Sequence, residues 1–365
     1  MIVAAIVGLA ATLSLETRFR LARARVLATD TVELEKLGRH FIVGYRDPAE
    51  IDRLIERRAL GGVFVSARNV EGLSGGAIRR QIDRWQDQRR RQDMPLLWIA
   101  TDQEGGAVSR LSPPLPRQAP IASVVAQFPD KDARQKAAHD YGLAQGRALA
   151  TLGVNLNFAP VVDLNRNVVN PNDRYTRIRD RATSGDPMIV TDVARHYSAC
   201  RNPAYGARSS TFPDSAPCSR TPTSRPATCA FHPMSSSVPT GFLSVRSATA
   251  TPSIMLSHAR LTALDAERPV SFSATIVSGV LRGRWSQEGV LITDDFSMGA
   301  VYGSKPGIAA AGVAALNAGV DLILVSYDPA QYFTLMNALI TAARAGGLAP
   351  AVLDRSARRL AGTAR

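Results

Sequence analysis

The sequence predicts an α/β protein whose main domain is a closed barrel of eight β/α units, a (β/α)₈ TIM barrel. Seven short runs of apolar and β-branched residues recur along the chain, and amphipathic stretches separate them. That alternation is typical of a parallel sheet covered by helices. Several of these runs end in a polar or charged residue, as strands do at the catalytic edge of such a barrel. A length of 365 residues and a hydrophobic content of 45% are sufficient for a core of this size.

The expected strands, in chain order, span residues 41–45, 62–66, 96–101, 154–158, 254–257, 290–293 and 321–325. Helices are expected between them, for example over residues 75–90, where Ile78, Ile82 and Trp85 recur on one face, and over residues 308–318. Seven strands are one short of a closed barrel. The missing fifth strand should lie between residues 158 and 254.

The interval over residues 199–253 has an unusual composition. It contains eleven Ser, eight Pro, seven Thr and all three cysteines, but a single acidic residue, Asp214, and no Lys or Ile. Neither a helical nor a strand period is visible there, and so few apolar residues do not offset the entropy of ordering. Two explanations remain open: a natural insertion or linker, or a segment translated out of frame or replaced. In either case we expect residues 200–253 to be aberrant or disordered, and the fifth strand and the loop after it to be disrupted.

The N-terminus carries an apolar run over residues 1–13, so we divide the chain into an apolar helical extension, 1–30, and a single barrel domain, 31–365. The run is shorter than the roughly 20 residues that a spanning helix needs, and no basic segment precedes it. A frayed helix, a remnant of an export signal and an anchor remain open. We expect no stable membrane span and a cytoplasmic location, or an exported or periplasmic one if residues 1–13 are a signal remnant.

The charge and cysteine content limit the partners. Lys and Arg number 44 and Asp and Glu 31, which gives a net charge of +13. Aromatic residues make up only 6% and do not alternate with basic residues, which argues against a nucleic-acid partner. The cysteines Cys200, Cys218 and Cys229 form no CxxC pair, so neither a zinc site nor a disulfide framework is indicated. The sequence does not specify the oligomeric state.

Two motifs end predicted strands in carboxylates. TDQEGGAVSRL, residues 101–111, holds Asp102 and Arg110 in one loop, where they could bracket a ligand rich in hydroxyls or simply brace the loop as an ion pair. GVNLNFAPVVDL, residues 153–164, ends in Asp163, which could equally be a loop cap.

A third motif, EGVLITDDFSMG at residues 288–299, brings Asp294 and Asp295 to the same edge. One of the two can face a ligand while the other turns away, and such a carboxylate can attack an anomeric carbon or act as a base. Asp295 could also be a helix N-cap. Because no His or third carboxylate lies at ligand spacing, we expect no metal.

These motifs, together with GGVFVSARN, RIRDRATSGDP, MLSHARLTALD and ALNAGVDLILV in the same order, resemble the bacterial β-N-acetylhexosaminidases of glycoside hydrolase family 3. The resemblance implies one (β/α)₈ barrel that removes terminal N-acetylglucosamine from muropeptides in cell-wall recycling, with retention of configuration and no cofactor. It implies that Asp294 is the nucleophile and that Asp102, Arg110 and Arg181 bind the amino-sugar or muropeptide substrate. His258 matches a strand-end histidine, which we interpret as structural.

The chain departs from this family where the acid/base should be. The family has a fifth strand ending in Lys-His-Phe-Pro-Gly-His-Gly and then a loop with an Asp-x-His pair, whose His is the general acid/base. Here the Lys-His pair falls near Ser210 and Thr211, and His232 is the only histidine in the interval. We therefore expect an impaired hydrolase that has lost its acid/base. The alternative is a catalytically silent sugar-binding or interaction protein on the same barrel.

Overall fold

The computed structural model describes residues 2–165, 177–199, 242–245, 253–304 and 306–363. Its main sheet has eight strands in the order β6-β3-β2-β1-β10-β9-β8-β7, and a small second sheet pairs β4 with β5. Seven strands of the main sheet are parallel, whereas β7 runs antiparallel to β8. The strands are β1 (Phe41–Val43), β2 (Gly62–Phe64), β3 (Trp98–Thr101), β4 (Gln103–Gly105), β5 (Val108–Ser109), β6 (Leu156–Asn157), β7 (Phe242–Val245), β8 (Ser253–Leu256), β9 (Leu291–Asp295) and β10 (Leu322–Val325).

The seven predicted strands are confirmed as the seven parallel strands, and the fold is of the α/β class. The expectation that no regular structure occurs over residues 200–253 is wrong at its C-terminal end. Phe242–Val245 forms β7, and Ser253 already belongs to β8. An edge strand such as β7 can pair with either polarity because only one neighbour constrains it. The rest of that interval lies outside the described residues.

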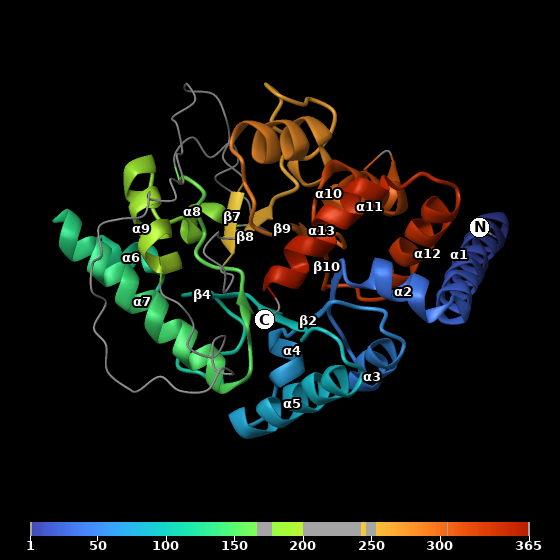
Figure 1. Cartoon of the computed structure of the whole chain (residues 1–365), viewed down its shortest axis with the longest axis horizontal. Coiled ribbons are helices and arrows are strands. Elements are labelled where there is room, and N and C mark those ends of the chain that lie inside the picture. The colour runs from blue at the N-terminus through green and yellow to red at the C-terminus, as the bar shows by residue number, and fades with distance from the viewer. Residues whose placement is uncertain (1, 166–176, 200–241, 246–252, 305, 364–365) are drawn as a thin grey trace.

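Helices surround the sheet (Figure 1). They are α1 (Ile2–Ala28), α2 (Thr31–Gly38), α3 (Pro48–Glu56), α4 (Ala67–Val70), α5 (Gly75–Arg91), α6 (Ile121–Val125), α7 (Lys131–Thr151), α8 (Ile178–Arg181), α9 (Pro187–Ala199), the 3₁₀ turn η2 (Val270–Phe272), the π-helical segment η3 (Thr275–Arg284), α10 (Gly299–Tyr302), α11 (Gly307–Ala318), α12 (Gln331–Arg344) and α13 (Pro350–Thr363). The two helices expected over 75–90 and 308–318 are α5 and α11. In α5 the predicted face is buried as expected, through Ile78, Ile82 and Trp85.

The strands bury both of their faces, with alternate residues in different clusters. Ile42 of β1 packs in an inner cluster with the stacked rings of Phe64 and Phe158, whose centroids are 5.8 Å apart. Its neighbours Phe41 and Val43 pack in the outer cluster with the helices. This period of two, with one set of side chains inside the curved sheet and the other under the helices, is how a (β/α)₈-like sheet packs. Burial on both faces explains why the strands read as continuous apolar runs.

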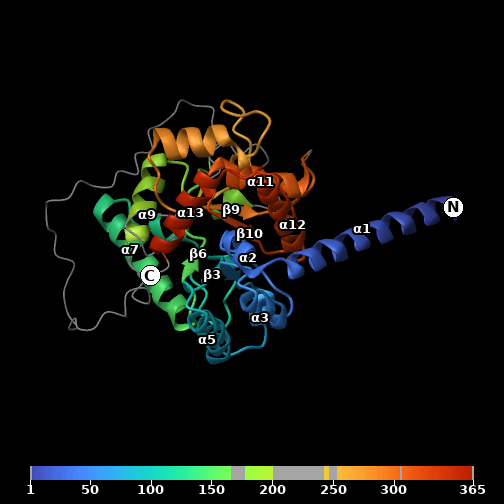
Figure 2. The same cartoon turned by 45° about the vertical axis from the view of Figure 1, so that its right-hand side comes forward.

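The N-terminal extension predicted for residues 1–30 is a single helix, α1, which projects from the barrel (Figure 2). Its C-terminal half contacts α12: the rings of Phe19 and Phe333 lie 6.1 Å apart, edge to face, and the Arg23 guanidinium lies 5.3 Å from the Phe333 ring centroid. No helix in the described part of the chain is long and apolar enough to cross a membrane.

Candidate active site

The site is built where the parallel strands end, and its first part is the loop after β3. Asp102 follows β3 directly, and the chain then folds back through β4 and β5 so that the Arg110 N–H donates to the Asp102 carbonyl at 3.0 Å. Gly105 and Gly106 make this turn with φ of 96° and 59°. At Gly105 a Cβ would lie 2.0 Å from the Tyr141 hydroxyl, so a side chain there would displace the helix that packs on the loop.

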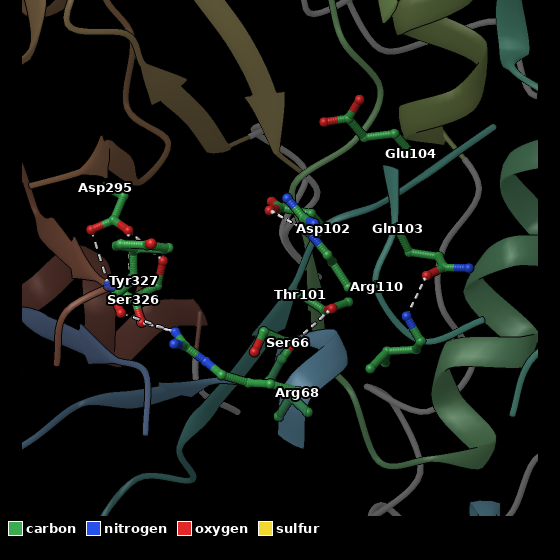
Figure 3. A network of polar contacts seen from close by, with 12 residues as sticks. Ser66, Arg68, Thr101, Asp102, Gln103, Glu104, Arg110, Asp295, Ser326 and Tyr327 are labelled. Atoms are coloured by element: carbon green, nitrogen blue, oxygen red, sulfur yellow. Dashed lines mark hydrogen bonds and ion pairs between the residues drawn. The ribbon is translucent and has the colours of Figure 1, made fainter. Parts of the chain in front are cut away.

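The loop places the two predicted side chains next to each other. The Arg110 Nε lies 3.7 Å from Asp102 Oδ2, and the two side chains are 46% and 27% exposed (Figure 3). Gln103 lies between strand end and turn and fixes the loop, since its amide donates to Ser112 Oγ at 2.8 Å and accepts from the Leu111 N–H at 3.0 Å. A rigid loop therefore holds Asp102 and Arg110 side by side, both partly buried, as a pair able to hold hydroxyl groups.

Arg181, the third predicted substrate residue, is held by Glu104. Its Nε donates to Glu104 Oε2 at 2.9 Å and its Nη2 donates to Oε1 at 2.5 Å. The Glu104 side chain is only 7% exposed and that of Arg181 21%. Glu104 is part of the TDQEGGAVSRL motif, but its pairing with Arg181 was not predicted. The available signal was its position two residues after Asp102, since residues i and i+2 of an extended segment share a face.

Asp294 and Asp295 end β9. Their side chains have different surroundings, as expected for two adjacent carboxylates at a strand end. Asp295 is buried, and its carboxylate accepts hydrogen bonds from the Ser297 N–H and hydroxyl, from the Ser326 N–H and hydroxyl, and from the Tyr327 N–H. It therefore ties β9 to the loop after β10. The N-cap interpretation of Asp295 is wrong, because α10 begins at Gly299 with Met298 as its N-cap.

The Asp294 side chain is half-buried, and its Oδ1 accepts the Asp295 N–H at 2.7 Å. This leaves a carboxylate oriented by the backbone at the strand end, among the other acids of the site. The His258 ring, by contrast, is engaged at both nitrogens: Nδ1 lies 2.7 Å from Ser271 Oγ and Nε2 lies 3.0 Å from the Asp295 carbonyl oxygen. A histidine so held supports the loop after β9, which agrees with the structural role expected for it.

The charges at this edge act on one another. Burial raises the pKa of Asp102 to about 7, and the negative charges of Glu104 and Asp294 act in the same direction, while Arg110 and Arg181 oppose them. Asp294 and Asp102 thus lie close enough to interact electrostatically, although β9 and β3 are four places apart in the sheet. Only a curved sheet brings strands so far apart in its order together.

Asp163, after β6, completes the acidic cluster. Its side chain is buried, and burial raises its pKa to about 7, with Asp294 and Glu104 adding to the effect and Arg181 opposing it. Arg181 is the buried cation among these carboxylates. Burial disfavours its charge, but its hydrogen bonds to Glu104 and the neighbouring negative charges outweigh that cost and raise its pKa.

The four predicted site residues, Asp102, Arg110, Arg181 and Asp294, therefore meet at one edge, and Glu104 and Asp163 join them. In the described part of the chain, no group of three or more His, Cys, Asp or Glu side chains is arranged to hold a metal ion. A cluster of acids around one arginine suits the recognition of hydroxyl groups and the stabilisation of a developing positive charge.

Comparison with known proteins shows which family the chain resembles. The family model described as the glycosyl hydrolase family 3 N terminal domain matches residues 31–201 and 241–362. A β-hexosaminidase of Alkalilimnicola ehrlichii is 32% identical over 297 residues, 78% of this chain and 79% of that protein. The β-hexosaminidase LpqI of Mycobacterium tuberculosis is 27% identical over 334 residues, 90% and 81% of the two chains.

Solved structures share the fold. The β-N-acetylhexosaminidase of Beutenbergia cavernae superposes with a TM-score of 0.64 at 23% identity, covering 91% of this chain and 98% of that one. A family 3 β-N-acetylglucosaminidase from a Paenibacillus strain gives a TM-score of 0.64 at 23% identity, and a fungal multi-domain β-N-acetylglucosaminidase gives 0.67 at 22%. Those two matches include 90% and 91% of this chain but only 61% and 39% of the two larger proteins. On the family match and the identity to the curated relatives, the chain belongs to glycoside hydrolase family 3, among the bacterial β-hexosaminidases.

Proposed function

We propose that this chain is a retaining β-N-acetylhexosaminidase that acts on terminal N-acetylglucosamine of peptidoglycan fragments, with Asp294 as nucleophile and with its general acid/base lost. The observation that carries the proposal is the position of Asp294. It is a backbone-oriented carboxylate at a strand end, in electrostatic contact with Asp102, Asp163 and Arg181. Relatives named β-hexosaminidase support the choice of amino sugar.

In the proposed mechanism Asp102, Arg110 and Arg181 hold the sugar hydroxyls and so orient the ring over Asp294. The Asp294 carboxylate attacks the anomeric carbon as the bond to the leaving oxygen breaks, and a covalent glycosyl ester forms. The surrounding carboxylates stabilise the positive charge that develops on the sugar ring. Water then attacks the same carbon from the opposite side, which releases Asp294 and restores the original configuration.

The proton for the leaving oxygen is the missing part. The match to the family model consists of two segments that leave residues 202–240 outside, the interval in which the family's Asp-x-His loop is expected. Among the described histidines, His258 uses both ring nitrogens, and His40 is buried at the opposite end of the strands, against Asp321. His139 and His196 lie within the helices α7 and α9 rather than at a strand end. Without general acid assistance, leaving groups that need a proton should depart about 10²–10⁴-fold more slowly.

The test compares two substrates of a chain first shown to be folded by circular dichroism. An aryl N-acetylglucosaminide with an activated leaving group needs no proton, so its hydrolysis should be retained, while a disaccharide should be cleaved far more slowly. Azide should accelerate turnover of the glycosyl ester, because an anionic nucleophile needs no base. No hydrolysis of the aryl glycoside by folded protein would reject the proposal and favour the silent sugar-binding protein.

A further inference from the structure

Three arginines gather at the amino ends of β1, β2 and β3, which is the end of the barrel opposite the candidate active site. Arg39 lies shortly before β1, Arg58 shortly before β2, and Arg89 in the last turn of α5, the helix that leads to β3. These strands are neighbours in the sheet, and α3 packs beside α5 (Figure 1). Because neighbouring parallel strands begin at the same edge, the three side chains are brought together there.

Glu35, in α2, pairs with two of these arginines at once. Arg58 Nη1 donates to Glu35 Oε2 at 3.1 Å, and Arg39 Nη2 lies 3.5 Å from Glu35 Oε1. Arg39 Nε donates to the main-chain carbonyl of Glu35 at 3.3 Å. One carboxylate therefore serves two guanidinium groups, and the positive charge of the pair of arginines is only half balanced.

Arg89 adds a third positive charge from beneath. It is only 3% exposed, its Nε donates to the Pro95 carbonyl at 3.1 Å, and no carboxylate among the described residues forms an ion pair with it. Burial lowers the pKa of Arg89 to about 10, and Arg58 and Arg39 lower it further, while Glu35 opposes them. A buried charge without a partner of opposite charge is costly, so this cluster is incomplete without an anion.

Arg58 has donors to spare and a fixed backbone. It follows the end of α3 with φ of 55°, a left-handed conformation that favours glycine, and its N–H donates to the Ile55 carbonyl at 2.9 Å. Its Nε and Nη2 donate to no protein atom within the described residues. These two parallel donors are the edge of a guanidinium that binds two oxygens of one anion. The side chains of Arg58 and Arg39 are 38% and 34% exposed, so an anion from solvent can reach both.

We propose that Arg39, Arg58 and Arg89 form a binding site for a phosphate group, at the opposite end of the barrel from Asp294. Arg58 and Arg39 donate to the phosphate oxygens, and Arg89 contributes its charge from beneath. Three guanidinium charges less the one carboxylate of Glu35 leave two positive charges, which match a phosphate dianion. The site is independent of the proposed hydrolase, because none of its residues takes part in that mechanism.

The first test measures the Kd of inorganic phosphate and of glycerol 2-phosphate by titration calorimetry at constant ionic strength. Arg58→Gln should raise the Kd at least about tenfold, because it removes a charge-assisted pair of hydrogen bonds. Glu35→Gln should lower the Kd, because it removes the competing carboxylate. The control is Arg79→Gln in α5, whose exposed pair with Asp83 lies outside the cluster and whose loss should leave the Kd unchanged. Binding of both ligands identifies a phosphate ester as an acceptable source, and binding of inorganic phosphate alone identifies the free anion.

The second test follows thermal unfolding with and without phosphate. Phosphate stabilises many proteins by exclusion from their surface, so the measured quantity is the difference in its effect between variants. Phosphate should raise the Tm of the unmodified chain and of Arg79→Gln more than that of Arg58→Gln. Arg89→Met removes the unpaired buried charge, so it should raise the Tm in the absence of phosphate and reduce the response to it.

An equal rise of Tm with phosphate in the unmodified chain, Arg58→Gln and Arg89→Met would overturn the site. So would an absence of measurable binding by the unmodified chain, or a Kd that Glu35→Gln leaves unchanged or raises. None of these measurements uses hydrolysis, so they decide the phosphate site whether or not the chain cleaves an aryl glycoside.

Discussion

Arg181 donates two parallel hydrogen bonds to Glu104, a residue 77 positions earlier in the chain, and so joins the loop after β3 to α8. The pair is largely buried, with 7% of the Glu104 side chain and 21% of the Arg181 side chain exposed. A bidentate pair fixes the plane of the guanidinium as well as its position. Glu104 is therefore a positioning residue for Arg181, which is less exposed than the other site arginine, Arg110.

Glu104→Gln should lower the free energy of unfolding by about 3 kcal/mol, because it leaves the charge of Arg181 uncompensated in a buried position. It should also raise KM for the aryl glycoside more than it lowers kcat. Urea denaturation and steady-state kinetics measure the two effects. Asp180→Asn is the matched control, because its pair with Arg177 on the same helix is exposed on both sides and should change stability by less than about 1 kcal/mol. Equal stability losses in the two variants would contradict the role of Glu104.

Substitutions of the neighbouring residues Asp294 and Asp295 should have different effects, one on activity and the other on stability. Asp294→Asn should abolish aryl glycoside hydrolysis with little effect on unfolding, because the side chain is half-buried and holds one neighbouring N–H. Asp295→Ala should lower the free energy of unfolding by about 3 kcal/mol, since it leaves the buried N–H of Ser326 and the partly buried N–H of Tyr327 without an acceptor. Thermal melts and activity of both variants check this. Retained hydrolysis in Asp294→Asn would remove the nucleophile assignment.

The sequence predicted the seven parallel strands because each is buried on both faces, so that its residues form an apolar run readable without a partner. It also predicted that Asp102 and Asp294 lie at the same edge of the sheet, because each comes directly at the end of such a run. The pairing of Glu104 with Arg181 could not be predicted, since two residues 77 apart meet only because β3 and β6 lie side by side in the sheet. The polarity of β7 and the exposure of Tyr327 are likewise decided by neighbours distant in sequence.

Asp102 should make the protein less stable at higher pH. Its pKa is about 7 in the folded protein and near 4 when unfolded, so between these values the folded state binds more protons. The free energy of unfolding contributed by this group therefore falls as pH rises from about 4 to 7. Asp102→Asn removes the charge and should be more stable than the unmodified chain at pH 8, yet similar to it at pH 4. Urea denaturation at both pH values tests this, and a stability difference independent of pH would refute it.

His40 should act in the opposite direction, from the other end of the barrel. It is fully buried, its Nδ1 lies 2.9 Å from the Asp321 carbonyl oxygen, and the Asp321 carboxylate accepts hydrogen bonds from Arg282 and Arg359. Burial lowers the pKa of His40 from 6.5 to about 4, and nearby Arg39 and Arg359 oppose its charge as well.

Between pH 6.5 and about 4, His40 is therefore protonated in the unfolded chain but neutral in the folded chain. The stability from the neutral ring is complete above about 6.5 and is lost as pH falls through that window, by ~3 kcal/mol in total. His40→Gln keeps an N–H donor for the Asp321 carbonyl but cannot titrate. We expect it to lower stability at pH 7 and to remove that part of the pH dependence, which unfolding measured at pH 4, 5, 6 and 7 would show. A variant whose stability falls with acid as steeply as that of the unmodified chain would show that other groups control the response.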